Sequence, residues 1–322
     1  MTAADLSRYE ATLSQASAYP HELENLAWAY QYAYNPVIRT YADRIGVQGP
    51  VSVPISFFKH MALKTGDWEA ETWFESSGTT GQSPSRHLVR TPETYIQQSL
   101  KGFFQFFPRQ SYRILALLPS YLERGQSSLV YMVRGWMDQI GLPGSGFYLY
   151  NHQALAQAIS EAGDAGEPIL LIGVSYALLD FAEAMPMHLP PGTIVMETGG
   201  MKGRREELIR DKLHARLCDG LGISTVASEY GMTELLSQAY ATAQGRFYPT
   251  TSLRAWVSDI HLDRLEVPHG VTGRLHLVDL ANIHTCAFIA TDDLARMYPD
   301  GSFEVLGRLD QAEARGCSLM YA

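Results

Sequence analysis

The sequence predicts an α/β protein with mostly parallel sheets and helices on both faces, followed by a small antiparallel sheet or barrel. Between residues 91 and 227, short apolar runs alternate with segments of helical periodicity, which is the pattern of a parallel sheet covered by helices. Past Gly245, short strands follow one another without helices, separated by Gly, Pro and Asp turns, which is typical of antiparallel sheets. We therefore expect an α/β body over residues 1–244, a β subdomain over 245–306 and a tail over 307–322.

Local patterns place the expected elements along the chain. Residues 5–45 have apolar residues at helical spacing and predict two or three helices. Thr91-Pro92-Glu93 combines an N-cap, a proline at the first helical position and an acid in the first turn, so a helix begins there and runs to about Phe107. The other expected strands of the body cover residues 112–118, 146–150, 168–174, 193–196 and 223–227. The other expected helices cover residues 127–140, 153–162 and 204–221, and a further helix follows the strand 168–174 and runs to about residue 187. In the β subdomain, strands are expected over 254–257, 273–278, 287–289 and 303–306.

Composition and charge argue against several classes of function. The chain has 322 residues, of which 46% are hydrophobic and 18% charged, so it can form one large domain or two smaller ones. Its net charge of −9 and the lack of a basic run argue against a nucleic-acid partner. No apolar stretch approaches the roughly 20 residues that cross a bilayer, and Met1–Glu10 does not have a signal-peptide pattern. We expect a cytoplasmic protein without a membrane span.

The cysteines and histidines do not predict a metal centre. Cys218, Cys286 and Cys317 form no CxxC pair, and the ten histidines lack ligand spacing, so zinc chemistry is not expected. Cys218 lies at apolar spacing on a helix and Cys286 stands beside Ala287-Phe288, so we expect both in the core.

A loop of small residues follows the apolar run that ends at Phe74. Hydroxyls and glycines of this kind can direct N–H and O–H groups onto one anion, which is how a loop holds a phosphate. The loop lacks the ending of a Walker motif and the spacing of a dinucleotide fingerprint. Taken alone, a solvated turn is the simpler interpretation. We call it the Ser/Thr/Gly loop; its members are Ser76, Ser77, Gly78, Thr79, Thr80 and Gly81.

Four later stretches also carry chemistry-bearing residues. In the stretch 228–234, Thr233 and Glu234 place a hydroxyl beside a carboxylate, which can hold a phosphate and its magnesium; the simpler alternative is a helix start. Glycines in Glu197-Thr198-Gly199-Gly200 would let a flat ring lie on the backbone, although a plain βα turn has the same pattern. Downstream lie Thr291-Asp292-Asp293-Leu294 and Gly307-Arg308-Leu309-Asp310.

Taken in their order along the chain, the Ser/Thr/Gly loop and these later stretches resemble the motifs of the ANL superfamily of adenylate-forming enzymes. This superfamily includes acyl-CoA synthetases, luciferases and nonribosomal adenylation domains. The Ser/Thr/Gly loop resembles the family's phosphate loop, and residues 230–234 resemble its Tyr-Gly-x-Thr-Glu motif. Residues 291–294 are similar to its Thr-Gly-Asp-Leu motif, and residues 307–310 to its Gly-Arg-x-Asp hinge. The resemblance implies the ANL large-domain fold, ATP and Mg²⁺ as cofactors, and attack of a carboxylate on the α-phosphorus of ATP.

The resemblance also implies a role for individual residues. Thr79 and Thr80 would hold the ATP phosphates together with the rest of the Ser/Thr/Gly loop. Tyr230 would lie against the adenine beside Gly199 and Gly200, and Gly231 would belong to the same nucleotide site. Thr233 would contact the α-phosphate and Glu234 would bind Mg²⁺. Asp293 would take the ribose hydroxyls, with Arg308 nearby.

The sequence departs from the family pattern in two places. Most members continue after the hinge into a mobile lid with a catalytic lysine, whereas this sequence stops at Ala322, so we expect the lid to be absent. The phosphate loop also lacks its usual lysine. Arg86, Lys202 or Arg204 could supply the positive charge, and each could equally be a solvated surface cation.

One branch of the superfamily shares further stretches with this chain. Residues 118–124, 197–204 and 315–319 resemble the LuxE-type acyl-protein synthetases, the fatty-acid-activating component of a bioluminescence fatty acid reductase complex. That resemblance implies a fatty acid substrate whose acyl group passes from AMP to a cysteine near the C-terminus and then to an acyl-reductase or acyl-carrier protein. Cys317 stands at the matching position, and an inert tail thiol is the alternative.

Two further readings stay open. The chain could resemble phenylacetate-CoA ligases and use CoA as the acyl acceptor. It could also be a non-catalytic homologue that binds nucleotide or a carrier protein, since the lysines of the loop and the lid are missing.

Overall fold

The computed structural model describes residues 2–76, 83–119, 126–199, 208–262 and 264–309. The chain forms two compact units that are interleaved in sequence. Unit 1 comprises residues 1–102, 233–239 and 248–322, and unit 2 comprises residues 103–232 and 240–247. The three-part division expected from the sequence stays a prediction.

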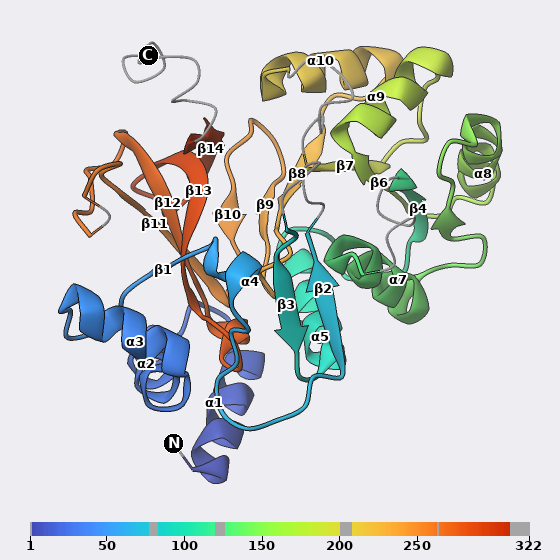
Figure 1. The fold of residues 1–322 in the computed structure, drawn as a ribbon. Coiled ribbons are helices and arrows are strands. Elements are labelled where there is room, and N and C mark those ends of the chain that lie inside the picture. Colours follow the sequence, from blue (N-terminus) through green and yellow to red (C-terminus); the bar gives the residue numbers. More distant parts are fainter. Residues whose placement is uncertain (1, 77–82, 120–125, 200–207, 263, 310–322) are drawn as a thin grey trace. The chain divides into compact units, whose positions relative to one another are not determined.

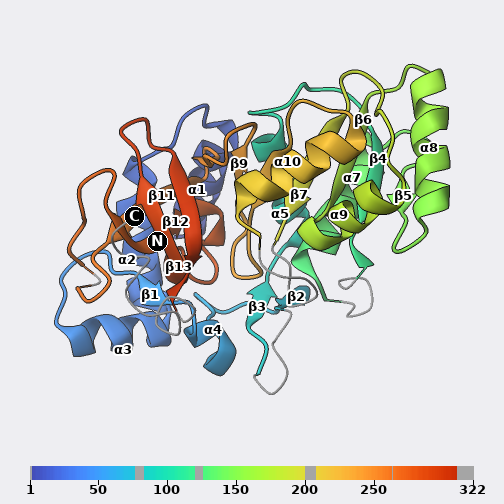
Figure 2. The same ribbon diagram turned by 90° about the horizontal axis from the view of Figure 1, so that it is seen from above.

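Unit 2 contains a parallel sheet whose strands alternate with helices, as predicted (Figures 1 and 2). Strands β8, β7, β6, β4 and β5 are neighbours in that order, and each printed pair among them is parallel. Every residue of β6 is buried, because a central parallel strand covered on both faces has no solvent side. The elements are β4 Arg113–Leu117, α7 Ser128–Ile140, β5 Gly146–Phe147, α8 His152–Asp164, β6 Ile169–Val174, α9 Ser175–Ala184, β7 Ile194–Thr198, α10 Arg210–Leu221 and β8 Ala227–Tyr230, with β9 Ala239–Ala241 where the chain passes between the units.

Unit 1 combines N-terminal helices, a two-stranded hairpin and a five-stranded sheet. In the sheet, β11, β12, β13 and β14 pair antiparallel, and β1 pairs parallel with β13. The predicted antiparallel sheet is therefore present. The elements are α1 Ala3–Gln15, α2 Glu22–Tyr34, α3 Pro36–Ile45, β1 Val53–Pro54, α4 Phe57–His60, β2 Thr72–Glu75, β3 Arg86–Val89, α5 Pro92–Phe103 at the edge of the unit, β10 Tyr248–Pro249, β11 Leu253–Ser258, β12 Thr272–Asp279, the short 3₁₀ helix η1 Leu280–Asn282, β13 Phe288–Met297 and β14 Phe303–Arg308.

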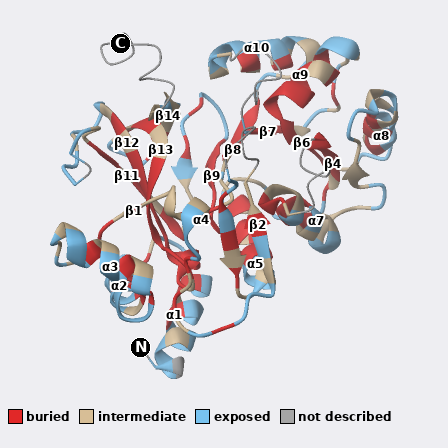
Figure 3. Ribbon diagram, in the orientation of Figure 1, coloured by how far each residue is buried: buried red, intermediate tan, exposed pale blue. Residues whose placement is uncertain are grey.

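Buried side chains connect the N-terminal helices of unit 1 to its sheet and to η1, and Figure 3 shows that β11, β12 and β13 are largely buried. The Tyr9 hydroxyl donates to the carbonyl of Leu280 over 2.9 Å. The Trp28 ring packs edge-on against Phe288, with 5.7 Å between the ring centroids. Residues more than 250 positions apart therefore share one core. Among the described helices, none is both long enough and apolar enough to cross a bilayer.

The structure corrects several predicted boundaries. The expected strand over 223–227 is wrong: Gly222 ends α10 with a φ of 61°, and the strand begins only at Ala227, where it pairs with Met196 of β7. The expected short strand over 287–289 is the start of the ten-residue β13. The helix from Pro92 ends at Phe103 instead of Phe107. The strand β3 was not expected, because its four residues include Arg86 and His87.

Candidate active site

The Ser/Thr/Gly loop begins and ends on a hairpin that holds its two ends together. Strands β2 and β3 pair antiparallel, with Glu75 opposite Arg86. The Ser76 N–H donates to the Ser85 carbonyl over 3.1 Å, and the Ser85 N–H donates to the Ser76 hydroxyl oxygen over 2.9 Å. The hairpin therefore fixes where the loop starts and closes. The other loop members, Ser77, Gly78, Thr79, Thr80 and Gly81, lie outside the described residues.

Arg86, one candidate for the missing loop cation, is engaged on the hairpin itself. Its guanidinium forms an ion pair with Glu75 at 2.9 Å and lies 5.3 Å from the centroid of the Trp73 ring. The Arg86 side chain is 59% exposed, so this pair is worth about 1 kcal/mol or less. The structure favours the surface-cation interpretation for Arg86. The other two candidates, Lys202 and Arg204, lie outside the described residues.

The backbone of Thr233 and Glu234 is held by buried side chains. The His87 Nδ1 lies 2.8 Å from the Thr233 carbonyl oxygen, and its Nε2 lies 3.1 Å from the Thr285 hydroxyl. A carbonyl oxygen only accepts, so Nδ1 carries the proton and Nε2 accepts from Thr285. Burial lowers the pKa of His87 to about 4, which keeps the ring in this neutral form. The Asn282 side chain donates to the Glu234 carbonyl over 2.8 Å.

Asp279 fixes the backbone just after Glu234, a role that the sequence analysis missed. One carboxylate oxygen accepts the N–H groups of Leu236 and Ser237 over 2.7 and 3.1 Å. The other accepts the Ser237 hydroxyl over 2.6 Å and the Ala281 N–H over 3.0 Å. Burial raises the pKa of Asp279 to about 6 against these hydrogen bonds. An acid at the end of a buried strand is a signal for such a role.

The Glu234 carboxyl lies at the base of the Ser/Thr/Gly loop. It is 5% exposed and forms a hydrogen bond with the side chain of Ser85, the residue that closes the hairpin. Burial raises the pKa of Glu234, and the positive charges of Lys59 and Arg308 only partly offset that effect. A buried carboxylate with incomplete compensation is suited to a divalent cation. Mg²⁺ commonly uses one or two carboxylates and takes its other ligands from water and phosphates.

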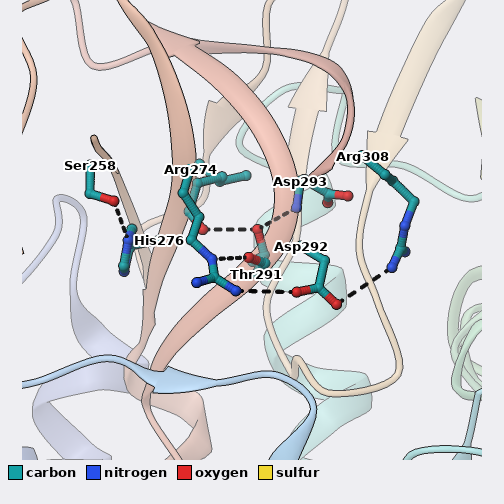
Figure 4. Close-up of polar contacts among 8 residues, drawn as sticks. Ser258, Arg274, His276, Thr291, Asp292, Asp293 and Arg308 are labelled. Carbon is teal, nitrogen blue, oxygen red and sulfur yellow. Dashed lines mark hydrogen bonds and ion pairs between the residues drawn. The ribbon is translucent and has the colours of Figure 1, made fainter. Parts of the chain in front are cut away.

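The residues Thr291 to Asp293 form a bulge in β13. Arg274 of β12 stands opposite Leu294 and His276 stands opposite Ala290, so three residues of β13 face one residue of β12. The Thr291 hydroxyl donates to the Leu275 carbonyl over 2.8 Å and accepts the Asp293 N–H over 3.1 Å (Figure 4). Bulges redirect side chains and are frequent near active sites. Here the bulge sets the directions of the two neighbouring carboxylates, Asp292 and Asp293.

Arg308 lies beside Asp293 on the neighbouring strand, as the resemblance implied. Asp293 of β13 and Arg308 of β14 are register partners. The guanidinium of Arg308, however, forms its ion pair with the preceding residue, Asp292, over 3.5 Å (Figure 4). Arg308 also lowers the pKa of Glu234 through its charge. In unit 1, Ser76 and Glu234 are thus linked through Ser85, while Asp293 and Arg308 are register partners and the charge of Arg308 acts on Glu234.

Unit 2 holds the residues predicted for the adenine, at the carboxyl ends of β7 and β8. Gly199 leaves β7 with a φ of 66°, a conformation that favours glycine. The Ser175 hydroxyl lies within hydrogen-bonding distance of both the Glu197 carboxylate, at 2.8 Å, and the Gly199 carbonyl, at 2.5 Å. The Tyr230 ring, followed by Gly231, packs against Phe247 with 5.6 Å between centroids. Gly200 lies outside the described residues.

Two buried glutamates at these strand ends have different charge states, and the sequence analysis did not predict their roles. Glu197 is buried, but hydrogen bonding to His214 and the charge of Arg210 outweigh the effect of burial and hold its pKa below the usual value. The Thr198 hydroxyl donates to Glu229. Burial, with a smaller contribution from the neighbouring Glu197 charge, raises the pKa of Glu229 to about 7. Near neutral pH, Glu197 is ionised and Glu229 is partly protonated.

Replacing Glu229 with glutamine should change the pH dependence of stability. The folded-state pKa of about 7 lies above the usual value of 4.5, so the folded protein retains this proton and its stability falls as pH rises from 4.5 to about 7. At about 1.4 kcal/mol per pKa unit, the loss is roughly 3 kcal/mol. Glu229→Gln should lack this loss and gain stability relative to wild type over that range. Denaturant unfolding at pH 4.5, 6 and 8 measures the free energy of unfolding of both proteins. If the two free energies changed with pH in the same way, the raised pKa of Glu229 would be contradicted.

The two described cysteines differ in burial. Cys286 is fully buried, as predicted, and burial raises its pKa to about 12. Cys218 is only partly buried, so the prediction of a core position is wrong for this residue. Burial still raises the pKa of Cys218. Neither thiol is therefore a good source of thiolate at neutral pH. Cys317 lies outside the described residues.

A comparison with protein families identifies the group to which the chain belongs. The model of the LuxE acyl-protein synthetase family matches residues 150–322, more than half of the sequence. The chain belongs to the LuxE acyl-protein synthetase family. The match includes the stretches that hold Gly199, Tyr230, Glu234 and Asp293. No protein in a search of curated sequences matches the chain.

Solved structures show that this LuxE-family chain has the fold of the ANL large domain. ATP-bound MatB from Rhodopseudomonas palustris matches 77% of the chain with a TM-score of 0.56 and 16% identity. O-succinylbenzoate CoA synthetase from Bacillus subtilis in complex with AMP matches 74% with a TM-score of 0.53 and 15% identity. A long-chain-fatty-acid–CoA ligase from Archaeoglobus fulgidus matches 73% with a TM-score of 0.52 and 14% identity. The chain covers 50%, 49% and 51% of these proteins, about half of each.

Proposed function

We propose that this LuxE-family chain activates a carboxylic acid of the fatty acid class with ATP. The product is an acyl-adenylate, and the acyl group then passes to Cys317 and on to a partner protein. The observation that carries the proposal is the cluster at the base of the Ser/Thr/Gly loop. There the buried Glu234 carboxyl meets Ser85 of the hairpin and the charges of Lys59 and Arg308. This combination of an acid, a hydroxyl and cations suits a magnesium–phosphate group.

The first step is a displacement at phosphorus. A carboxylate oxygen of the acid attacks the α-phosphorus, the bond to the bridging oxygen of pyrophosphate breaks, and pyrophosphate leaves with that electron pair. Thr79, Thr80 and Thr233 supply hydroxyls and N–H groups to the phosphates. Glu234 would hold Mg²⁺, which neutralises charge on the phosphates and supports the leaving group. Catalysis of this kind depends on positioning and charge neutralisation, and the fixed backbone around Glu234 provides the positioning.

The remaining predicted residues recognise the nucleoside. Tyr230 would lie against the adenine beside Gly199, Gly200 and Gly231. The Gly199 turn is held through its carbonyl by Ser175, so this part of the backbone is already ordered. Asp293 would accept the ribose hydroxyls, and the bulge fixes its backbone through Thr291.

The second step uses a thiol. The Cys317 thiolate attacks the carbonyl carbon of the acyl-adenylate, the bond to the AMP oxygen breaks, and a thioester forms as AMP leaves. The raised pKa values of Cys218 and Cys286 support Cys317 as the acceptor among the three cysteines of the chain. An acyl-reductase or an acyl-carrier protein is the proposed final acceptor.

Asp293→Ala should weaken ATP binding more than it slows chemistry. Two ribose hydroxyls lose a charged acceptor, and a hydrogen bond to a charged group is worth roughly 1.5–3 kcal/mol, or about ten- to a hundredfold in binding. Steady-state kinetics should show this factor in the KM for ATP, with kcat within a few fold of wild type. Asp293→Asn keeps an acceptor oxygen, so its KM for ATP should lie between those of wild type and Asp293→Ala. An unchanged KM with a collapsed kcat would assign Asp293 another role.

The identity of the products tests the proposed reaction. The full chain is incubated with ATP, Mg²⁺ and fatty acids of several lengths, and the products are separated by chromatography and mass spectrometry. We expect AMP, pyrophosphate and an acyl-adenylate that appear only when the acid is present. Formation of ADP and phosphate would exclude adenylation. Adenylate without protein-bound acyl, together with acyl-CoA when CoA is added, would identify CoA as the acceptor.

A further inference from the structure

Asp292 connects two arginines from the strands on either side of it. The Arg274 side chain of β12 donates through Nε to the Thr291 carbonyl over 2.7 Å and through a terminal nitrogen to Asp292 Oδ1 over 3.3 Å. The other carboxylate oxygen, Oδ2, forms the ion pair with Arg308 of β14 at 3.5 Å. Figure 4 shows the resulting row, Arg274, Asp292 and Arg308, across the three strands.

The two halves of this row differ in how firmly they are held. The Arg274 side chain is 16% exposed and is fixed by its bond to the backbone of the bulge. The Arg308 side chain is 49% exposed at the end of β14. A long exposed side chain loses rotamer entropy when it is fixed in one orientation. Asp292, itself held by the buried Arg274, therefore restricts the orientation of the exposed Arg308 side chain.

We propose that Asp292 is a positioning residue of the nucleotide site. It holds the Arg308 guanidinium in the orientation that the nucleotide requires, so that this entropy is lost before ATP binds. The proposal rests on the proposed function, in which the charge of Arg308 belongs to the cluster that receives the magnesium–nucleotide group. Arg274 contributes to the same positioning, because it anchors the Asp292 carboxylate that orients Arg308.

Simple electrostatics gives the opposite expectation for the loss of Asp292. Removing a negative charge near a bound polyanion strengthens the attraction for that polyanion. Asp292→Asn should therefore bind ATP more tightly if the charge alone matters, and more weakly if positioning dominates. Whether the affinity for ATP rises or falls in Asp292→Asn therefore distinguishes the charge effect from the positioning effect.

The experiment is a calorimetric titration of the full chain with ATP and Mg²⁺, without an acid. We expect Asp292→Asn to raise the Kd for ATP roughly five- to tenfold. Asp292→Glu, which retains a carboxylate, should recover most of the affinity. The double variant Asp292→Asn/Arg308→Ala should bind no more weakly than Arg308→Ala alone, because the two residues act together. Glu304→Gln, which removes one negative charge from the same strand as Arg308, is the control and should stay within about twofold of wild type.

Several results would overturn the proposal. One is ATP binding by Asp292→Asn that is unchanged or tighter than in wild type. Another is a double variant whose loss of ATP affinity is the product of the losses in the two single variants. Should Asp292→Asn fail to fold, Arg274→Lys replaces it. This variant keeps the charge but loses the Nε bond, and it should show the same weakening; normal affinity would overturn the proposal. A wild-type chain that binds ATP but forms no adenylate refutes the proposed function alone, while a wild-type chain that does not bind ATP refutes both.

Discussion

Glu234→Ala should lower the rate of acid-dependent ATP–pyrophosphate exchange by about 100-fold or more, since a metal that neutralises phosphate charge is worth several kcal/mol. The fold should remain intact, because the buried carboxyl contributes a raised pKa and hence an unfavourable charge to the folded state. Exchange rates measured over a range of Mg²⁺ concentrations check the prediction. The variant should need far more Mg²⁺ for any residual activity.

The matched control for that experiment is Glu304→Gln. It also removes one acid from unit 1, but Glu304 accepts the Tyr298 hydroxyl and is a register partner of Arg296, away from the loop base. Its exchange rate and magnesium dependence should match those of wild type. A Glu234→Ala protein with the magnesium dependence of wild type would remove Glu234 from the proposed metal site.

Cys317→Ser should abolish acyl labelling of the protein while adenylate formation continues nearly unchanged. Incubation with ATP and a labelled fatty acid should leave label on the denatured wild-type chain, and neutral hydroxylamine should remove it, as expected for a thioester. The serine variant loses only the second step, because the thiol acts after adenylation as a covalent nucleophile. The label is followed on denaturing gels, and adenylate is measured as pyrophosphate exchange.

The other two cysteines provide the controls for labelling. Cys218→Ser and Cys286→Ser should both keep the label. Cys286→Ser places a hydroxyl in a fully buried position and should cost some stability, whereas Cys218 is partly exposed and should cost less. Label that persists in Cys317→Ser would assign the acyl group to another residue. If the wild-type chain catalysed pyrophosphate exchange but carried no label, CoA or another protein would be the acyl acceptor.

The local signals in the sequence predicted the elements of the fold better than their exact limits. Thr91-Pro92-Glu93 predicted a helix, and the structure begins that helix at Pro92. The apolar run 168–174 predicted a buried strand, which is present as β6. The start of β8 was misplaced because its limits depend on pairing with β7, and residues 223–226 include three β-branched residues, which favour strands, without belonging to the strand. A pattern along one strand does not contain its register with another.

The same reasoning explains which parts of the candidate site were found. Residues in the sequence motifs, such as Glu234 and Asp293, could be predicted because their order along the chain resembles a known family. The side chains that hold them could not, because Asp279 and His87 lie 45 and 147 positions from Glu234 in the sequence and meet it only in the folded chain. The bulge at residues 291–293 was also missed, since alternation in a single strand cannot show that three residues face one.

Acid-dependent pyrophosphate exchange in the full chain tests the central claim most directly. Labelled pyrophosphate is mixed with ATP, Mg²⁺ and each member of a panel of carboxylic acids, from short aliphatic and aromatic acids to long fatty acids, and the label entering ATP is counted. Exchange requires that the α-phosphorus bond breaks and forms reversibly, so it reports adenylation even when the acyl acceptor is missing. We predict exchange that depends on the acid and is fastest with fatty acids. A chain that binds ATP yet shows no exchange with any acid would contradict the account.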